Sequence, residues 1–133
     1  MSNSISISRE YWPEVTDEPH FIISIDYEGC RIKFDDIYFK GLDEVITRLE
    51  ALKDERKGGV TLNGGFRFNA SIEPTHSGAI QFKFFTESSA DFPGRLCLEG
   101  YSVIPGEDAT RFTGSLIRLF RDGKALNLSL CRY

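Results

Sequence analysis

The chain has 133 residues, of which 41% are hydrophobic and 27% are charged, and its formal net charge is −4. This length suits one domain whose core needs neither disulfides nor metals, and the composition excludes long disorder. The sequence has no run of about 18 apolar residues, and its N-terminus has no basic segment followed by an apolar one. It therefore predicts neither a membrane span nor a signal peptide.

Charge is distributed unevenly along the chain. Residues 10–50 contain eleven acids and four bases, a net charge of −7, which leaves +3 for the remainder. Because binding of phosphates requires a basic surface, the acidic first third disfavours nucleic acid as the main ligand and suits a basic protein partner. For each individual acid, the alternative is a solvated position with no partner.

The three cysteines, Cys30, Cys97 and Cys131, form no Cys-x-x-Cys pair and have no histidine at metal-ligand spacing. We therefore expect three reduced thiols in a cytoplasmic protein, with no metal and no cofactor. Cys30 shares a face with Ile32 and Phe34, which predicts a small core residue at this position.

The first 19 residues are expected to form an irregular acidic arm, apart from a short edge strand at residues 5–8, where apolar and polar side chains alternate. Tyr11 and Trp12 precede Pro13, and a proline favours an extended conformation in the residue before it. Trp12 either anchors the arm on the core or forms an interface hot spot, a role that tryptophan favours.

Residues 21–34 alternate between apolar and polar side chains on both sides of a glycine, which predicts a β-hairpin. Its outer face carries opposite charges on the two strands. Asp26 and Glu28 therefore either pair across the strands with Arg31 and Lys33 or remain available to a partner.

Asp35 and Asp36 are expected to form a polar turn, followed by a short strand at residues 37–39. Apolar residues then recur at helical spacing over residues 42–57, with acids in the first turn and bases in the last. This pattern predicts an α-helix that ends at a pair of glycines.

Residues 66–86 have the most regular pattern in the chain, two alternating segments joined by a polar turn. The apolar residues fall on one face, which we expect to be the core. The other face should be exposed, and it would display Arg67, Asn69, Ser71, Glu73, Gln81, Lys83 and Phe85.

A further strand is expected at residues 95–104, with a bulge at Gly100 because the apolar residues change parity there. Pro105 and two acids then start a second helix, and residues 125–131 form the last strand. Hairpin-length connections indicate antiparallel pairing. The sequence thus predicts a single α+β domain over residues 1–133, a largely antiparallel sheet of about six to eight strands with two helices packed on one face.

No catalytic constellation is evident in the sequence. The two histidines, His20 and His76, lie in turn-like contexts, without a nucleophile elbow or an oxyanion loop. The exposed sheet face mixes charges and shows no pair of neighbouring aromatics, which argues against stacking of nucleic-acid bases. We therefore expect no catalytic residues and no enzymatic activity.

Several segments resemble a known class of proteins. These are the Gly41-Leu42-Asp43 helix start, the Glu55-Arg56-Lys57-Gly58-Gly59 helix exit, the phenylalanine-rich meander and the Ile104-Pro105-Gly106-Glu107 helix start. Their layout, over about residues 20–122, resembles small bacterial proteins that serve as immunity proteins of polymorphic toxin or contact-dependent inhibition systems. The resemblance lies in the layout and carries over no individual residue.

The resemblance implies a protein that binds one toxin domain, often a basic nuclease, and neutralises it. The residues expected to contact this partner are Asp26, Glu28, Asp35 and Asp36, through their charge, and Tyr11 and Trp12, as aromatic anchors. No nucleic acid and no membrane is expected as a partner. The alternative is a small-molecule-binding or enzymatic α+β domain.

Overall fold

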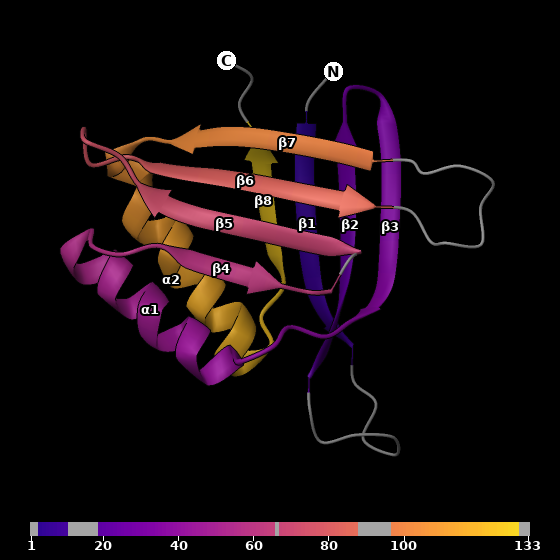
Figure 1. Cartoon of the computed structure of the whole chain (residues 1–133), viewed down its shortest axis with the longest axis horizontal. Helices are drawn as coiled ribbons and strands as arrows, with labels where there is room; N and C mark the ends of the chain where they lie inside the picture. Colours follow the sequence, from indigo (N-terminus) through magenta and orange to yellow (C-terminus); the bar gives the residue numbers. More distant parts are fainter. Residues whose placement is uncertain (1–2, 11–18, 66, 88–96, 131–133) are drawn as a thin grey trace.

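The computed structural model describes residues 3–10, 19–65, 67–87 and 97–130. They form eight β-strands and two α-helices in the order β1-β2-β3-α1-β4-β5-β6-β7-α2-β8 (Figure 1). Every strand pair is antiparallel. The predicted α+β class, with antiparallel strands and two helices, is confirmed.

The first sheet has four strands in the order β3-β2-β1-β8. Their bounds are β1 (Asn3–Glu10), β2 (His20–Tyr27), β3 (Cys30–Ile37) and β8 (Leu126–Leu130). The prediction of a short edge strand within an irregular arm is wrong for residues 3–10, because β1 is longer and lies in the middle of this sheet. Ile5 and Ile7 are buried there, and both neighbours pair with their strand.

The second sheet has the order β4-β5-β6-β7. Its strands are β4 (Val60–Asn63), β5 (Phe68–Pro74), β6 (Ile80–Glu87) and β7 (Cys97–Ile104). In Figure 1 this sheet lies in front of the first, and the strands of the two sheets cross at a large angle. The strands are thus divided between two sheets, a division that hairpin patterns do not reveal because they specify only neighbouring strands.

The helices are α1 (Leu42–Glu55) and α2 (Gly106–Asp122), which pack against each other. α2 is the more buried, with side chains directed at both sheets: Phe120 contacts the ring of Phe21 on β2, and Phe112 contacts that of Phe82 on β6. In Figure 1, α2 lies behind the β4–β7 sheet and α1 lies beside β4, along the edge of that sheet. No helix in the described part of the chain is long and apolar enough to cross a membrane.

α1 ends two residues before its predicted end at residue 57, and Arg56 explains why. This residue adopts a left-handed backbone (φ 55°), and its guanidinium donates hydrogen bonds to the carbonyls of Leu52 and Lys53. The same side chain donates to Thr110 Oγ1 on α2 at 2.7 Å. The last carbonyls of α1 are therefore satisfied by a side chain that also links the two helices.

Aromatic rings form the centre of the core. Phe21, Phe39 and Phe68 are fully buried, and Phe39 lies within 6.1 Å, centroid to centroid, of Phe21, Phe68 and Phe120. Edge-to-face contacts of this kind add to the free energy gained from burial of the ring surfaces. One apolar cluster therefore joins both sheets and α2.

Two local predictions are wrong. Asp35 and Asp36 do not form a turn between strands but a β-bulge within β3, where Phe34 and Ile37 face Ile23 and Phe21, respectively, on β2. Gly100 does not mark a bulge, because the pairing of β6 with β7 is continuous from Ile80 to Glu87.

Candidate functional site

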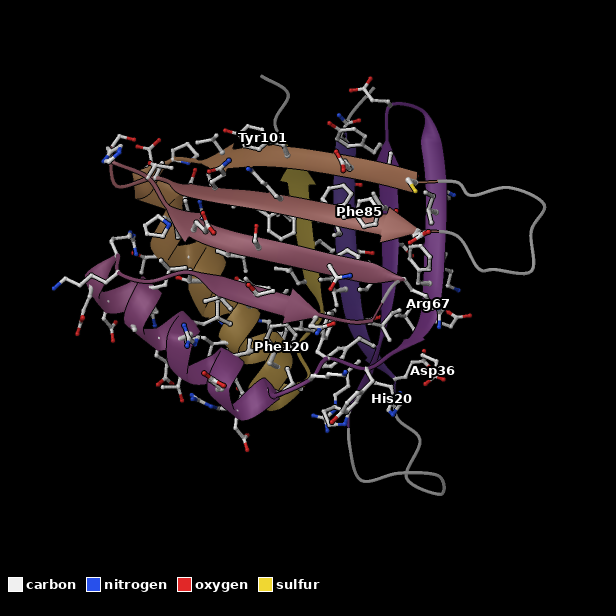
Figure 2. The ribbon with its side chains drawn as sticks, viewed as in Figure 1. His20, Asp36, Arg67, Phe85, Tyr101 and Phe120 are labelled. Atoms are coloured by element: carbon white, nitrogen blue, oxygen red, sulfur yellow. The ribbon has the colours of Figure 1, made fainter. Side chains whose placement is uncertain are left out.

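The strongest surface feature is a groove on the outer face of the β4–β7 sheet. We use "the groove" for an open depression of about 660 Å³, lined in part by inward residues such as Phe84 and by Tyr27 of the other sheet. Its outward side chains include Asn69, Ser71, Lys83, Phe85, Glu99 and Tyr101. Figure 2 shows Tyr101 and Phe85 over β7 and β6. The predicted exposed face therefore exists and is hollowed.

Strand register brings these side chains together. Lys83 lies opposite Tyr101 and Phe85 lies opposite Glu99, so the two aromatic residues are diagonal neighbours on adjacent strands. The Lys83 ammonium lies 6.0 Å from the centroid of the Tyr101 ring, at the outer limit of a cation–π contact. The sequence prediction found no neighbouring aromatics because it placed a bulge at Gly100.

Gly100 shapes the sheet beneath the groove. A β-carbon built at this position would lie 2.0 Å from the Phe84 ring, so only glycine leaves room for that ring on the inner face. Gly100 is buried opposite Phe84, and its strand continues without a shift. The parity signal that suggested a bulge therefore marks a packing requirement, with Tyr101 left facing solvent.

Two charged side chains of the groove have no ion-pair partner among the described residues. Lys83 and Glu99 are both exposed, and neither contributes to a salt bridge within this part of the chain. Tyr101 is 42% exposed, more than any other large hydrophobic side chain among the described residues. The groove thus combines exposed aromatic surface with charges of both signs.

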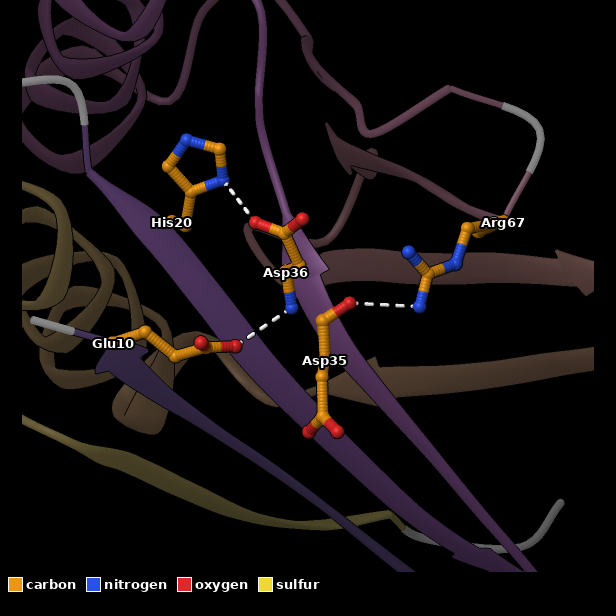
Figure 3. A network of polar contacts seen from close by, with 5 residues as sticks. All are labelled: Glu10, His20, Asp35, Asp36 and Arg67. Atoms are coloured by element: carbon orange, nitrogen blue, oxygen red, sulfur yellow. Dashed lines mark hydrogen bonds and ion pairs between the residues drawn. The ribbon is translucent and has the colours of Figure 1, made fainter. Parts of the chain in front are cut away.

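A second polar feature surrounds the bulge in β3 (Figure 3). Asp36 adopts a left-handed backbone (φ 59°), and its amide donates to Glu10 Oε1 at 2.6 Å. His20 Nδ1 is shielded from solvent and lies 2.6 Å from Asp36 Oδ1. The two groups are not aligned for a hydrogen bond, so this contact is an ion pair when the imidazole is protonated.

Asp35 connects the bulge to the second sheet. Its carbonyl accepts a hydrogen bond from Arg67 at 2.7 Å, and the Arg67 guanidinium lies 5.7 Å from the centroid of the Phe34 ring. The Asp35 carboxylate remains 66% exposed and lies 3.9 Å from Lys33 Nζ. The Asp36 carboxylate is similarly exposed (69%) but lies 2.6 Å from His20, so Asp35 is the less tightly paired of the two acids at the bulge.

The other predicted acids have contacts within the chain. Asp26 accepts a hydrogen bond of 2.8 Å from Arg31, its cross-strand neighbour, and this bond and the charge of Asp26 raise the pKa of the Arg31 guanidinium. Glu28 lies in the β2–β3 turn, where its amide donates to Asn3 Oδ1 at 2.9 Å.

The six predicted partner-binding residues are not gathered in one place. Asp26 and Glu28 lie at one end of the β2–β3 hairpin, whereas Asp35 and Asp36 lie toward the other end. Tyr11 and Trp12 lie outside the described residues. The groove contains none of the four that the structure describes. It contains Lys83 and Phe85, which were predicted only as members of an exposed face.

Two further findings complete the description of the site. Within the described residues, no group of three or more histidine, cysteine, aspartate or glutamate side chains is placed to hold a metal ion. In comparisons with known proteins, no protein-family model, no curated protein and no solved structure matches this chain.

Proposed function

We propose that this chain is a non-enzymatic protein-binding module, an immunity-type inhibitor that binds a toxin domain in the bacterial cytoplasm and neutralises it. The observation that carries the proposal is the groove, where the exposed ring of Tyr101 and the half-buried ring of Phe85 lie beside two exposed charges that have no ion-pair partner among the described residues. Exposed aromatic side chains beside polar groups are characteristic of protein-binding surfaces.

The aromatic residues supply the apolar contact. Burial of Tyr101 and Phe85 by a partner would remove apolar surface from water, and a rigid ring loses little conformational entropy in doing so. Lys83 and Glu99 flank these rings and select a partner that presents complementary charges. The groove therefore provides both contact area and orientation.

The exposed acid Asp35 supports a basic partner. It lies on β3, an edge strand of the other sheet, and Arg67 connects it to the sheet that carries the groove. Exposed charges of this kind accelerate encounter with an oppositely charged protein more than they strengthen the final complex. We expect Asp35→Asn to slow association at low salt and to leave dissociation nearly unchanged.

The test is capture of the partner from the organism that encodes the chain, with three baits. These are the wild-type protein, the groove variant Lys83→Ala and the matched control Lys57→Ala, which removes an exposed lysine just after α1. The proposal expects one protein that the wild type and Lys57→Ala retain and that Lys83→Ala retains less well. Equal retention by all three baits would show that the partner does not bind at the groove.

Neutralisation is tested on the captured protein itself. Expression of its bound domain alone should arrest growth, and co-expression with the wild-type chain should restore it. Phe85→Ala should restore growth less well, because it removes an aromatic contact from the groove. If the captured protein were harmless when expressed alone, the inhibitor function would be contradicted, but the groove would still be a protein-binding surface.

The volume of the groove favours one other candidate, a small-molecule-binding domain. About 660 Å³ lies within the range of ligand sites, and such sites combine apolar walls with a few polar groups. Native mass spectrometry of the protein purified from its own host distinguishes the two. A small molecule that is bound by the wild type and lost in Phe85→Ala would favour the ligand-binding candidate.

A further inference from the structure

The four edge strands of the two sheets differ in how they discourage pairing with other chains. β3 carries the charged residues Arg31, Lys33 and Asp35 and is interrupted by the bulge. β4 has only four residues and contacts α1, and β8 has five residues. Charges, bulges, short length and a covering helix are the devices that protect sheet edges.

β7 also contacts a helix, α2, but it is the least protected of the four, because it is neither short nor bulged. It has eight residues, its pairing with β6 is unbroken, and Glu99 is its only charged residue. Among the described strands, β6 is its only hydrogen-bonded neighbour. A long, regular edge strand with an exposed aromatic side chain is a template for strand addition.

We propose that β7 is the dimer interface of this protein, where β7 of a second copy adds in antiparallel orientation and the two β4–β7 sheets form one sheet of eight strands. A second copy is the occupant because β7 is complementary to itself. Glu99 and Lys83 lack ion-pair partners among the described residues, and a twofold axis can bring the two together across the interface.

The faces of the sheet restrict the register. Outward residues must face outward residues, so the axis passes through a residue and not between two residues. An axis at Glu99 places two like charges opposite each other, which is unfavourable. An axis at Gly100 avoids this and places Glu99 of one copy opposite Tyr101 of the other.

This register also provides charge complementarity. Tyr101 is opposite Lys83 on β6, so Glu99 of the second copy, Tyr101 and Lys83 form one row across three strands. Neighbouring strands are about 4.8 Å apart, which lets the two long charged side chains approach each other over the tyrosine. The second copy thus contributes its glutamate to the groove, and the grooves of both copies become one continuous surface.

The test measures self-association by sedimentation equilibrium at protein concentrations from about 10 to 300 µM. This range suits the micromolar dissociation constant expected of a small interface made by one pair of strands. Four proteins are compared: the wild type, Tyr101→Glu, Tyr101→Lys and the control Thr61→Glu, an exposed position on β4. The wild type and the control should dimerise equally. A monomeric wild type over the whole range would overturn the proposal.

The two Tyr101 variants test the register. Tyr101→Glu places a like charge opposite Glu99 of the second copy and should weaken dimerisation on the order of tenfold, since two symmetric pairs are affected. Tyr101→Lys places an opposite charge there and should dimerise at least as well as the wild type. If both variants lost the dimer, the axis at Gly100 would be wrong. That result would fit an axis at position 101, which places residue 101 of one copy opposite residue 101 of the other and so opposes like charges in both variants.

A charge swap tests whether the weaker dimerisation of Tyr101→Glu arises from the pairing of residues 99 and 101 across the axis. Glu99→Lys combined with Tyr101→Glu restores opposite charges across the axis and should recover the dimer that Tyr101→Glu alone loses. Circular dichroism and thermal unfolding confirm that each variant is folded. The test needs no partner protein, so it is independent of the proposed inhibitor function.

Discussion

The two sheets of this protein share one core but differ in their outer faces. The outer face of the β3-β2-β1-β8 sheet presents short hydroxyl side chains at its centre, Ser4, Ser6 and Ser8 on β1 and Ser24 on β2, and charged residues such as Arg31 and Lys33 on its edge strand β3. The outer face of the β4–β7 sheet presents Phe85, Tyr101 and longer charged side chains.

The difference shows how an alternating pattern can serve two purposes. On both sheets, most inward positions are apolar and stabilise the fold, with buried polar exceptions such as Thr86 and Ser102. Serine on the first outer face satisfies the pattern with little surface for a partner to contact. On the second outer face, aromatic residues leave apolar area exposed, which is unnecessary for folding and useful for binding.

The largest effect is expected in the aromatic core that the two sheets share. Phe120→Ala removes a ring that packs against both Phe21 and Phe39, and it should lower the free energy of unfolding by about 3–5 kcal/mol because of the cavity that remains. Urea denaturation measures this loss, and Phe120→Leu should cost less than half as much. A loss below about 1 kcal/mol would show that α2 does not join the two sheets as described.

The next effect concerns the β4–β7 sheet alone. Gly100→Ala forces a methyl group into the Phe84 ring and should cost about 1–3 kcal/mol. Combination with Phe84→Leu should recover part of this loss, because the smaller side chain vacates the space.

Gly114→Ala is the matched control for this prediction. It lies within α2, where a β-carbon meets nothing closer than 3.8 Å, and it should stabilise the protein by about 0.5–1 kcal/mol. If both substitutions raised the free energy of unfolding, the requirement for glycine under the groove would be refuted.

The bulge provides the corresponding test of the first sheet. Asp36→Gly and Asp36→Ala both remove the contact with His20, but only glycine adopts the left-handed backbone at no steric cost. Asp36→Gly should therefore be the more stable of the two by about 1 kcal/mol in thermal or urea unfolding. Equal stability would mean that the left-handed conformation is not retained in the variants.

The smallest effects are expected on the outer faces. Ser24→Thr and Lys83→Thr introduce the same residue on the two sheets, and each should change the free energy of unfolding by less than about 0.5 kcal/mol. Only Lys83→Thr should weaken partner binding, measured by the capture experiment above. Loss of binding in Ser24→Thr would instead show that the partner binds the outer face of the β3-β2-β1-β8 sheet.

Much of the secondary structure could be predicted from the sequence because local patterns specify it. The alternation in residues 66–86 gave β5 and β6, and the period of 3.6 residues gave both helices. Predictions at positions where the alternating pattern is interrupted were less accurate. The Asp35–Asp36 pair indicated a turn, yet a bulge accommodates both residues within a strand, because acidic residues tolerate the left-handed conformation.

The candidate site was only partly predictable. Lys83 and Phe85 were placed on an exposed face from alternation alone. Tyr101 was missed because Gly100 was interpreted as a bulge that re-aims the strand, and Glu99 was not assigned to a face. The decisive contact, between Gly100 and the Phe84 ring, joins residues 16 positions apart. No local pattern contains that information.

The sequence by itself determined the class of the fold, the two helices and the faces that strands such as β5 and β6 turn inward, because these depend on periodicity and on residues close together in the chain. The tertiary structure alone decided that the eight strands divide into two sheets, that β1 is central, and that Lys83, Phe85, Glu99 and Tyr101 meet in one groove. These features depend on the pairing of distant segments, which is selected by the free energy of one shared core.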